Sequence, residues 1–316
     1  MKRDPRSGKV GLIGTGMVGS SFAYCLMQSG LVSDLVLIDA DRGRAEGEAM
    51  DLNHGLAFVR PMTIRAGEYA DLTDAKVVVI TAGANQRPGQ SRLDLLQRNA
   101  AVIRDVVPKI TAVCPETTIV VATNPVDILT QIAEDVAALP AGRVLGSGTT
   151  LDTARLRFLL GGHYAVDPRS VHAYVVAEHG DSALALWSMA NVAGVRLEDF
   201  VSGSGRGYDR PALDAIFEQV RKAAYEIIQR KGSTYYAIGL ALLSVVEAIL
   251  RDQHTVLTVC STMRGRLGLE GIALSLPSIV GASGIEAVLE IPMSDEERDG
   301  FRRSAAILSE RLAELG

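Results

Sequence analysis

The sequence predicts an α/β protein in which a doubly wound parallel sheet is followed by an α+β substrate domain. Up to about residue 147, short apolar runs alternate with helical patterns. Runs that are apolar throughout are typical of parallel strands covered by helices on both faces. Beyond residue 148 this alternation is lost, and long helical segments are followed by strands of an antiparallel kind. We therefore divide the chain into an N-terminal domain at 1–147 and a C-terminal domain at 148–316.

The N-terminal half contains four runs that predict strands, at 9–13, 35–39, 76–82 and 117–123. Between the first two, residues 20–30 carry apolar side chains at helical spacing and end on a glycine, as helices commonly do. Between the last two runs a longer helix is indicated by one stripe of side chains at 3.6-residue spacing: Leu95, Leu96, Asn99, Val102, Ile103, Val106, Val107 and Ile110.

The C-terminal half begins with a helix from about Asp152 and a strand-like segment at 171–177. Helical patterns then cover roughly 210–231 and 235–251, and antiparallel strands are predicted at 256–260 and 272–276. A last helix is expected to begin at Ser294, because Glu297 completes a capping box with it.

Composition excludes several classes of protein. The net charge of −5 disfavours non-specific binding to nucleic acid, which needs a basic surface. No run of about 18 uncharged apolar residues is present, and the N-terminus lacks the apolar core of a signal peptide, so we expect no membrane association. Cys25, Cys114 and Cys260 have no metal-binding or CxxC spacing and are typical of reduced thiols. These features predict a cytoplasmic protein without a metal site.

A glycine-rich turn predicts a dinucleotide site. Gly14, Gly16 and Gly19 have GxGxxG spacing, follow a strand and open a helix, which is the arrangement of a Rossmann domain. The helix N-terminus would attract the pyrophosphate. Asp39 lies twenty residues beyond Gly19, at the end of the next strand, where it would accept hydrogen bonds from a ribose. Its charge would repel the extra phosphate of NADP, so the predicted cofactor is NAD.

Six further motifs accompany this turn: AGANQ at 82–86, GQSR at 89–92, ATNP at 122–125, GTTLDTAR at 148–155, EHGD at 178–181 and GSTYY at 232–236. With them the chain resembles the L-lactate/L-malate dehydrogenase family over nearly its whole length, and it is most similar to the bacterial L-lactate dehydrogenases. The resemblance implies NAD-dependent interconversion of pyruvate and L-lactate by a homotetramer. It also implies the site residues that follow.

His179 is the expected acid/base, because imidazole titrates near neutrality and can exchange a proton with the substrate oxygen. Asp152 is expected to orient the ring and to stabilise its charged form. Arg155, one helical turn from Asp152, would bind the substrate carboxylate through two parallel hydrogen bonds. Arg92, in a polar loop, would close over the substrate and stabilise charge on its carbonyl. His179, Asp152 and Arg92 are thus the predicted catalytic residues.

The remaining residues of the predicted site contact substrate or cofactor. Asn124, at the carboxyl edge of the sheet, is expected to bind both the substrate carbonyl and the nicotinamide side. Thr234 is expected at the substrate. The resemblance adds cofactor contacts at Met17, Val18, Gly83, Ala84 and Ser147.

Gln86 indicates the choice of substrate. Oxaloacetate has a second carboxylate, and an unpaired buried charge costs several kcal/mol, so a malate enzyme needs a cation where this chain has a neutral amide. Gln86 therefore favours pyruvate, and Thr234 supports the same choice. Malate dehydrogenase, with Arg87 shifted into this place, and a dehydrogenase of longer 2-hydroxy acids remain alternatives. A more distant one is a dinucleotide-binding protein without turnover.

Arg157 and His172 suggest an effector site. Arg157 follows Arg155 by two residues, so it points away from the catalytic pocket. In bacterial lactate dehydrogenases activated by fructose 1,6-bisphosphate, residues at these two positions bind the sugar phosphates across a subunit interface. The alternative is that both residues are structural.

Overall fold

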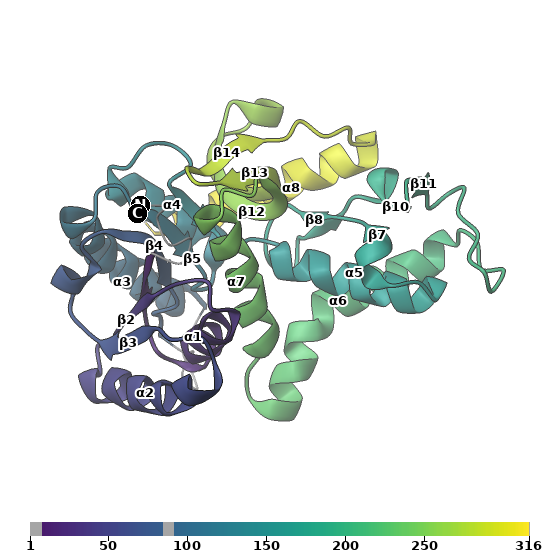
Figure 1. The fold of residues 1–316 in the computed structure, drawn as a ribbon. Coiled ribbons are helices and arrows are strands. Elements are labelled where there is room, and N and C mark those ends of the chain that lie inside the picture. The colour runs from purple at the N-terminus through teal and green to yellow at the C-terminus, as the bar shows by residue number, and fades with distance from the viewer. Residues whose placement is uncertain (1–7, 85–91, 316) are drawn as a thin grey trace.

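The computed structural model describes residues 8–84 and 92–315, and its largest sheet has nine strands (Figure 1). Its strands are β1 (Lys9–Ile13), β2 (Asp34–Ile38), β3 (Thr63–Ala66), β4 (Ala75–Ile80), β5 (Thr118–Val121), β6 (Val144–Gly146), β12 (Thr255–Arg264), β13 (Glu270–Gly281) and β14 (Gly284–Val288). The α-helices are α1 (Met17–Ser29), α2 (Arg42–His54), α3 (Arg92–Val113), α4 (Val126–Ala137), α5 (Thr150–Tyr164), α6 (Arg210–Lys231), α7 (Tyr236–Leu250) and α8 (Asp295–Ala313).

Six parallel strands form the Rossmann part of the sheet, in the order β3-β2-β1-β4-β5-β6. Alternate side chains of each strand enter two separate cores. Leu35 and Leu37 of β2 pack on the side of α1, α2 and α7, whereas Val36 and Ile38 pack on the side of α3, α4 and α8. The strands are apolar throughout because both of their faces are buried. The predicted fold class is confirmed.

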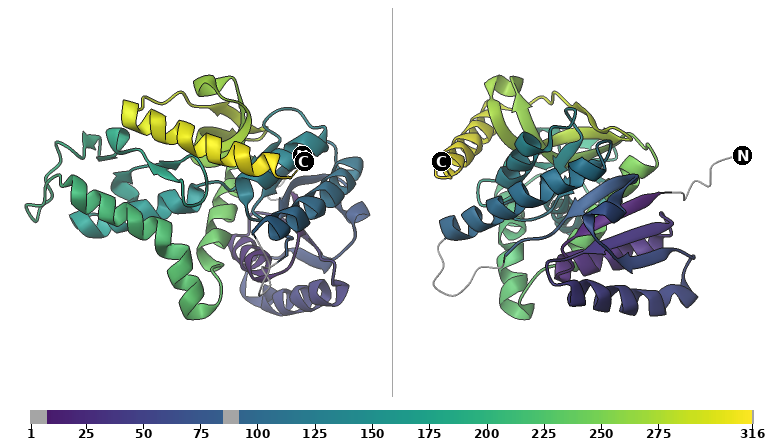
Figure 2. Two further views of the ribbon diagram at one scale, coloured as in Figure 1. Left: turned by 180° about the vertical axis from the view of Figure 1, so that it is seen from behind. Right: turned by 90° about the vertical axis from the view of Figure 1, so that its left-hand side faces the viewer.

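The antiparallel strands of the C-terminal half extend this same sheet. Cys260 of β12 pairs with Gly146 of β6, and β12 pairs along its length with β13, with Val259 opposite Leu276. The two predicted strands at 256–260 and 272–276 therefore exist, but they join the parallel sheet at its edge. Figure 2 shows α8 lying along this edge of the molecule, and its N-terminus has the predicted capping box between Ser294 and Glu297.

A third core lies between α5, α6 and the segment that follows α5. The strand expected at 171–177 is split into β7 (Val171–His172) and β8 (Val175–Val176). β8 pairs with β9 (Leu184–Ala185), whereas β7 joins β10 (Asn191–Val192) and β11 (Val195–Arg196) in a separate sheet. The carbonyl of Ala173, between the two halves, accepts a hydrogen bond from the Arg157 side chain in place of a strand partner.

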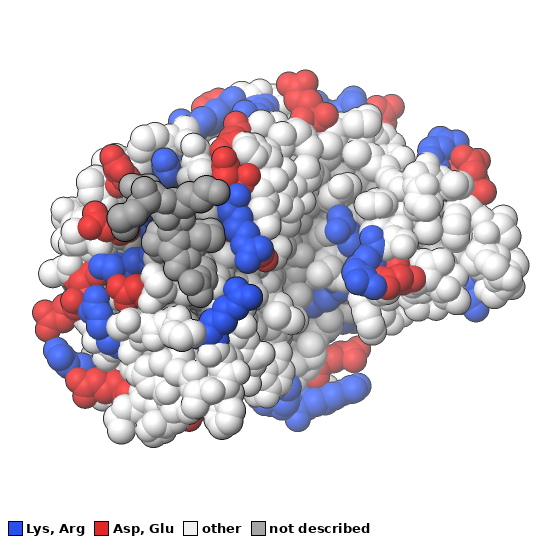
Figure 3. All heavy atoms as spheres, viewed as in Figure 1, with Lys and Arg blue, Asp and Glu red and all other residues white. Residues whose placement is uncertain are grey.

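The charge pattern of the surface and the hydropathy of the helices concern the predicted absence of nucleic-acid and membrane partners. On the face drawn in Figure 3, basic and acidic side chains are intermixed, and they form no broad patch of one sign. Among the described residues, no helix is both long enough and apolar enough to cross a membrane.

Candidate active site

A cleft of about 410 Å³ lies where the carboxyl end of β5, the N-terminal part of α5 and the loop after β8 meet. Its lining includes Asn124, Asp152, Arg155 and His179, so the structure brings together four residues that the sequence predicted. Apolar side chains of α3, α4 and α6 complete the walls. A largely apolar cleft with a few convergent polar groups is typical of a small-molecule site.

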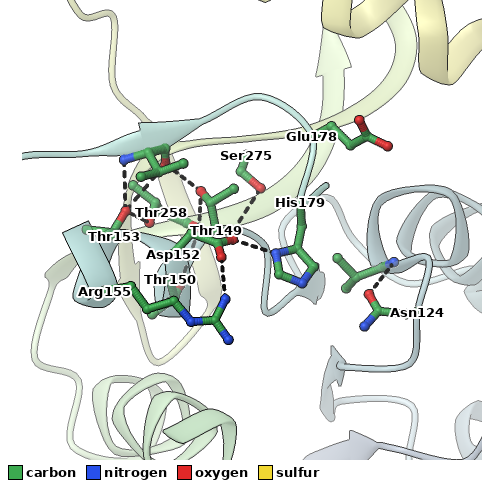
Figure 4. A network of polar contacts seen from close by, with 12 residues as sticks. Asn124, Thr149, Thr150, Asp152, Thr153, Arg155, Glu178, His179, Thr258 and Ser275 are labelled. Carbon is green, nitrogen blue, oxygen red and sulfur yellow. Dashed lines mark hydrogen bonds and ion pairs between the residues drawn. The ribbon is translucent and has the colours of Figure 1, made fainter. Parts of the chain in front are cut away.

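Asp152 holds the two cationic side chains of this cleft. Its Oδ2 lies 2.5 Å from Nδ1 of His179, and its Oδ1 accepts a 2.8 Å hydrogen bond from the Arg155 guanidinium. Figure 4 shows the carboxylate between these two groups. The side chain of Asp152 is 9% exposed and that of His179 is 26% exposed, so both are largely shielded from water. The other ring nitrogen, Nε2, remains for a substrate.

The pair changes the acidity of both groups. The charge of Asp152 raises the pKa of the His179 imidazole to about 9, although burial lowers it. Burial raises the pKa of Asp152, but the charges of His179 and Arg155 and their hydrogen bonds outweigh it, so that this pKa is lower than usual. His179 is therefore protonated and Asp152 ionised at neutral pH.

The backbone around His179 is held by residues that the sequence analysis did not name. The backbone N–H of His179 donates to Oδ2 of buried Asp127, on α4, at 2.8 Å. Glu178 forms an ion pair with Arg311 of α8 and accepts from the backbone N–H of Ser182 at 3.2 Å. Asp127 follows Asn124 by three residues, and this proximity in sequence is the only signal that could have drawn attention to it.

Asn124 is positioned by the buried side chain of Asn99. The Asn99 amide donates to the carbonyl of Asn124 at 2.9 Å and accepts from the backbone N–H of Ala84 at 2.8 Å. The segments that end β4 and β5 are thereby joined. The sequence analysis placed Asn99 on the apolar stripe of the helix, which is correct for its burial but missed this contact.

The glycine turn has the geometry that a dinucleotide requires. Gly14 has φ of +96°, and a Cβ on Gly19 would lie 2.1 Å from the carbonyl oxygen of Gly14, so the turn and the helix pack too closely for a side chain. A Cβ on Gly16 would meet no described atom within 4 Å apart from its chain neighbours, which leaves room for a pyrophosphate. The residues present therefore fit a dinucleotide.

Asp39 lies beside this turn, at the end of β2. Its Oδ2 accepts hydrogen bonds from the backbone N–H and the hydroxyl of Thr15, at 2.7 and 3.0 Å. Burial raises the pKa of Asp39. The hydrogen bonds from Thr15 and from the backbone of Asp41 together lower it by more, so the net shift of the pKa is downward. Asp39 is thus a fixed negative charge at the predicted ribose position.

The other predicted contacts are not among the residues that line the cleft. Met17 is exposed at the start of α1, next to half-buried Val18, and Met17 Sδ accepts from the hydroxyl of Ser233. Thr234, the next residue, is half-buried between α6 and α7, outside the lining of the cleft. Ser147 is buried directly after β6. Gly83 packs against Thr123, and a Cβ there would come within 2.4 Å of it.

Two predicted substrate contacts cannot be placed. Gln86, with its neighbour Arg87, lies outside the described residues. Arg92 is the first residue of α3, but its side chain is also outside the described part.

The predicted effector residues are on another surface. The Nε of Arg157 donates to the carbonyl of Ala173 at 3.0 Å, and its guanidinium lies 5.1 Å from the ring centre of Tyr174. His172 is exposed on β7, next to Ala173. Neither Arg157 nor His172 lines the cleft that holds His179.

The fold and the glycine turn define a dinucleotide-binding protein, and comparison with known proteins gives the family. Residues 8–146 match the NAD-binding domain of lactate/malate dehydrogenases, and residues 149–315 match the α/β C-terminal domain of the same proteins. The chain therefore belongs to the lactate/malate dehydrogenase family. The predicted resemblance and NAD as the predicted cofactor are both confirmed.

Individual relatives are similar over almost their full length. The L-lactate dehydrogenase of Moorella thermoacetica is 50% identical over 308 residues, which are 97% of each chain. That of Thermoanaerobacter pseudethanolicus is 46% identical and covers 97% of this chain and 99% of its own. Among solved structures, the minor L-lactate dehydrogenase of Enterococcus mundtii in a ligands-bound form has a TM-score of 0.94 at 41% identity, with 98% of this chain and 99% of the other covered.

Proposed function

We propose that this protein is an NAD-dependent L-lactate dehydrogenase, which interconverts pyruvate, NADH and a proton with L-lactate and NAD⁺. The observation that carries the proposal is the contact of Asp152 with both His179 and Arg155 at one cleft. A proton donor and a fixed guanidinium at this spacing suit a small 2-keto acid. The names of the relatives support lactate as the product.

His179 transfers the proton. NADH, when bound, supplies the hydride for the carbonyl carbon. In this direction His179 donates its proton to the carbonyl oxygen from Nε2, because Nδ1 is held by Asp152. With a pKa of about 9, the ring is protonated at neutral pH and ready for reduction. Oxidation of lactate needs the neutral ring, which accepts the hydroxyl proton, so oxidation is favoured as the pH rises toward that pKa.

Arg155 binds the substrate carboxylate. One of its terminal nitrogens is held by Asp152, which fixes the plane of the guanidinium at the cleft. A fixed fork can form two parallel hydrogen bonds to a carboxylate, and it then directs the neighbouring carbonyl toward His179.

The cofactor side is assigned to the turn and to the ends of three strands. Gly14, Gly16 and Gly19 give the pyrophosphate access to the backbone, with Met17 and Val18 in the same turn, and Asp39 holds the adenosine ribose. Gly83, Ala84, Asn124 and Ser147 border the nicotinamide side.

Substrate choice and loop closure are assigned to residues at the edge of the site. We propose that Gln86 and Thr234 accept the methyl end of pyruvate and that Arg92 approaches its carbonyl when the loop closes. The alternatives are a malate dehydrogenase and a dehydrogenase of longer 2-hydroxy acids. A comparison of kcat/KM for pyruvate, oxaloacetate and longer 2-keto acids distinguishes them.

We further propose that Arg157 and His172 bind fructose 1,6-bisphosphate. Their support is their position: Arg157 contacts Ala173, the residue after His172, on a surface separate from the catalytic cleft. A bisphosphate would neutralise the cationic side chains of neighbouring subunits and so favour an assembled, active state.

Assembly as a homotetramer is also proposed. Single exposed apolar side chains are common on protein surfaces, but several on neighbouring helices suggest a surface that another subunit covers. The helices beside the N-terminal sheet carry several exposed apolar side chains: Met17 and Tyr24 on α1, Met50 on α2, and Tyr236 and Leu240 on α7. Sedimentation of the purified protein tests this number of subunits. A cytoplasmic location and the division of the chain at 147/148 remain part of the same proposal.

Steady-state oxidation of NADH tests the function. We expect kcat/KM for pyruvate to exceed that for oxaloacetate and for longer 2-keto acids, and fructose 1,6-bisphosphate to lower the KM for pyruvate. The variant His179→Asn should reduce kcat by several orders of magnitude. A preference for oxaloacetate would contradict the assignment, and unchanged kinetics with the bisphosphate would remove the effector site.

A further inference from the structure

Besides Asp152, a second carboxylate faces His179, from the opposite half of the molecule. Asp127 is in the first turn of α4 and is only 2% exposed. Its Oδ2 accepts the backbone N–H of His179, and the carboxylate also has a side-chain hydrogen bond with the thiol of Cys260 on β12. A carboxylate that is ionised in a protein core is costly even when it is hydrogen-bonded. Such a group at the backbone of the acid/base histidine indicates a role in the reaction.

We propose that Asp127 is a positioning residue for the proton transfer: it fixes the backbone of His179 and its negative charge favours the protonated ring. The inference rests on the proposed function of His179. Asp152 fixes the ring through Nδ1, but a ring can still pivot with its backbone. The hydrogen bond from the His179 N–H to α4 removes that freedom, because α4 packs in the core on one face of the sheet.

The charges around Asp127 support this role. Three groups that can carry charge face it: His179 and Glu178 from the loop, and the thiol of Cys260 from β12. The charge of Asp127 adds to that of Asp152 in raising the pKa of His179. Burial is the main reason that the pKa of Cys260 lies well above its usual value, and Asp127 contributes, so the thiol stays neutral. His179 is therefore the only cation among these three neighbours.

Asp127 itself titrates in an accessible range. Burial raises the pKa of its carboxyl to about 6, against the effect of the hydrogen bond from His179. Above pH 6 it is ionised and helps to keep His179 protonated. Below pH 6 it becomes neutral, and its oxygen is then a weaker acceptor for the His179 N–H.

Two substitutions separate the charge from the hydrogen bond. Asp127→Asn keeps an oxygen that can accept from the His179 N–H but removes the charge, whereas Asp127→Ala removes both. For Asp127→Asn we expect the alkaline limb of kcat/KM for pyruvate to move down by a few tenths of a pH unit to about one unit. For Asp127→Ala we expect the same shift and a loss in kcat on the order of 10²-fold, because the ring is no longer fixed. KM should change much less than kcat.

Thr130→Val is the matched control. Thr130 is buried on the same helix; its hydroxyl donates to the carbonyl of Val126 and also hydrogen-bonds the thiol of Cys260, but it carries no charge and holds no part of His179. Its substitution should lower stability without moving the pH profile. The pKa of His179 is also measured without turnover, from the pH dependence of its modification by diethyl pyrocarbonate, followed by mass spectrometry of the peptide that contains His179.

The outcomes distinguish the proposed dehydrogenase function from the proposed role of Asp127. If wild-type protein does not reduce pyruvate, the proposed function fails, but the modification rate still reports on the pKa of His179 and on the effect of Asp127. If both Asp127 variants melt at lower temperature, as Thr130→Val does, but keep the wild-type kcat and the wild-type pKa of His179, then Asp127 is only structural and the inference is overturned.

Discussion

Asp152→Asn is the most direct test of the reasoning about the reaction centre. The substitution keeps the size of the side chain but removes the charge that is the main cause of the raised pKa of His179. The pKa is about 9 in the structure, against an ordinary value of 6.5. A difference of this size corresponds to roughly 3 kcal/mol in favour of the protonated ring, at about 1.36 kcal/mol per pKa unit. Without Asp152 we expect the pKa of His179 to fall to about 6.5 or below, because burial lowers it by more than the remaining charge of Asp127 raises it.

The sign of the effect follows from which form of the ring reacts. Reduction of pyruvate needs protonated His179, so kcat/KM for pyruvate is constant at low pH and falls as the pH rises through the pKa. In the wild type this limb is expected near pH 9. In Asp152→Asn it should lie two or more units lower, and the limb for oxidation of lactate, which rises through the same pKa, should move by the same amount.

The assay is the pH dependence of kcat/KM in both directions, with saturating cofactor. The absolute rate is a less specific measure, because asparagine can also hold the ring in the wrong tautomer and reduce kcat by about 10⁴, as the equivalent change does in a serine protease. Asp105→Asn is the control. It also removes a carboxylate, but that carboxylate is exposed on α3, is paired with Lys109 and does not line the cleft. A limb that stays near pH 9 in Asp152→Asn would refute the assignment of Asp152 as the main cause.

Three further predictions concern other parts of the molecule. Arg155→Lys should lower kcat/KM for pyruvate by roughly 10²-fold or more, mainly through KM, because a single ammonium cannot replace the two parallel hydrogen bonds; an unchanged KM would contradict the carboxylate role. Asp39→Ser should raise the ratio of kcat/KM with NADPH to that with NADH by about tenfold or more, since the repulsion of the extra phosphate is lost; a constant ratio would show that Asp39 does not select the cofactor. Arg311→Ala should lower the free energy of unfolding by about 2 kcal/mol, because buried Glu178 loses its ion pair, and urea denaturation measures this; equal midpoints would mean that the pair contributes nothing.

Much of the fold could be predicted because the strands of a covered parallel sheet are apolar on both faces. β1, β2, β4 and β5 all lie within or beside their predicted ranges. Several elements were not predicted, among them β3, α4 and β14, and two of the others show the physical reasons most clearly. α2 buries only Ala45, Ala49 and Leu52 among its thirteen residues, so its helical period is weak, and β6 has three residues, too few to show a pattern. That β12 would pair with β6 was equally hidden, because pairing between distant strands leaves no local pattern.

The site was predictable to the extent that its chemistry lies in short motifs. Asp152 and Arg155 share a helix face, so their contact follows from spacing alone. The contact of His179 with Asp152 came from the resemblance, since twenty-seven residues separate them and no spacing rule joins them. Asp127 and Asn99 were missed for a different reason. Each is a polar residue in a helical segment, and no pattern in the sequence marks its partner. Only the folded chain shows that Asp127 accepts from the backbone of His179 and that Asn99 donates to the backbone of Asn124.

The histidine loop is short, and loops of this kind are commonly mobile, yet proton transfer needs its ring within a few tenths of an ångström of one position. The structure meets this need by anchoring the loop to three helices: α4 and α8, which pack on one face of the sheet, and α5, which packs in the third core. α5 holds the ring through Asp152, α4 holds the backbone through Asp127, and α8 holds the preceding residue, Glu178, through Arg311. Because all three anchors are side chains of the protein itself, we expect that binding of the keto acid does not have to order the histidine and that its binding energy is available to orient the substrate.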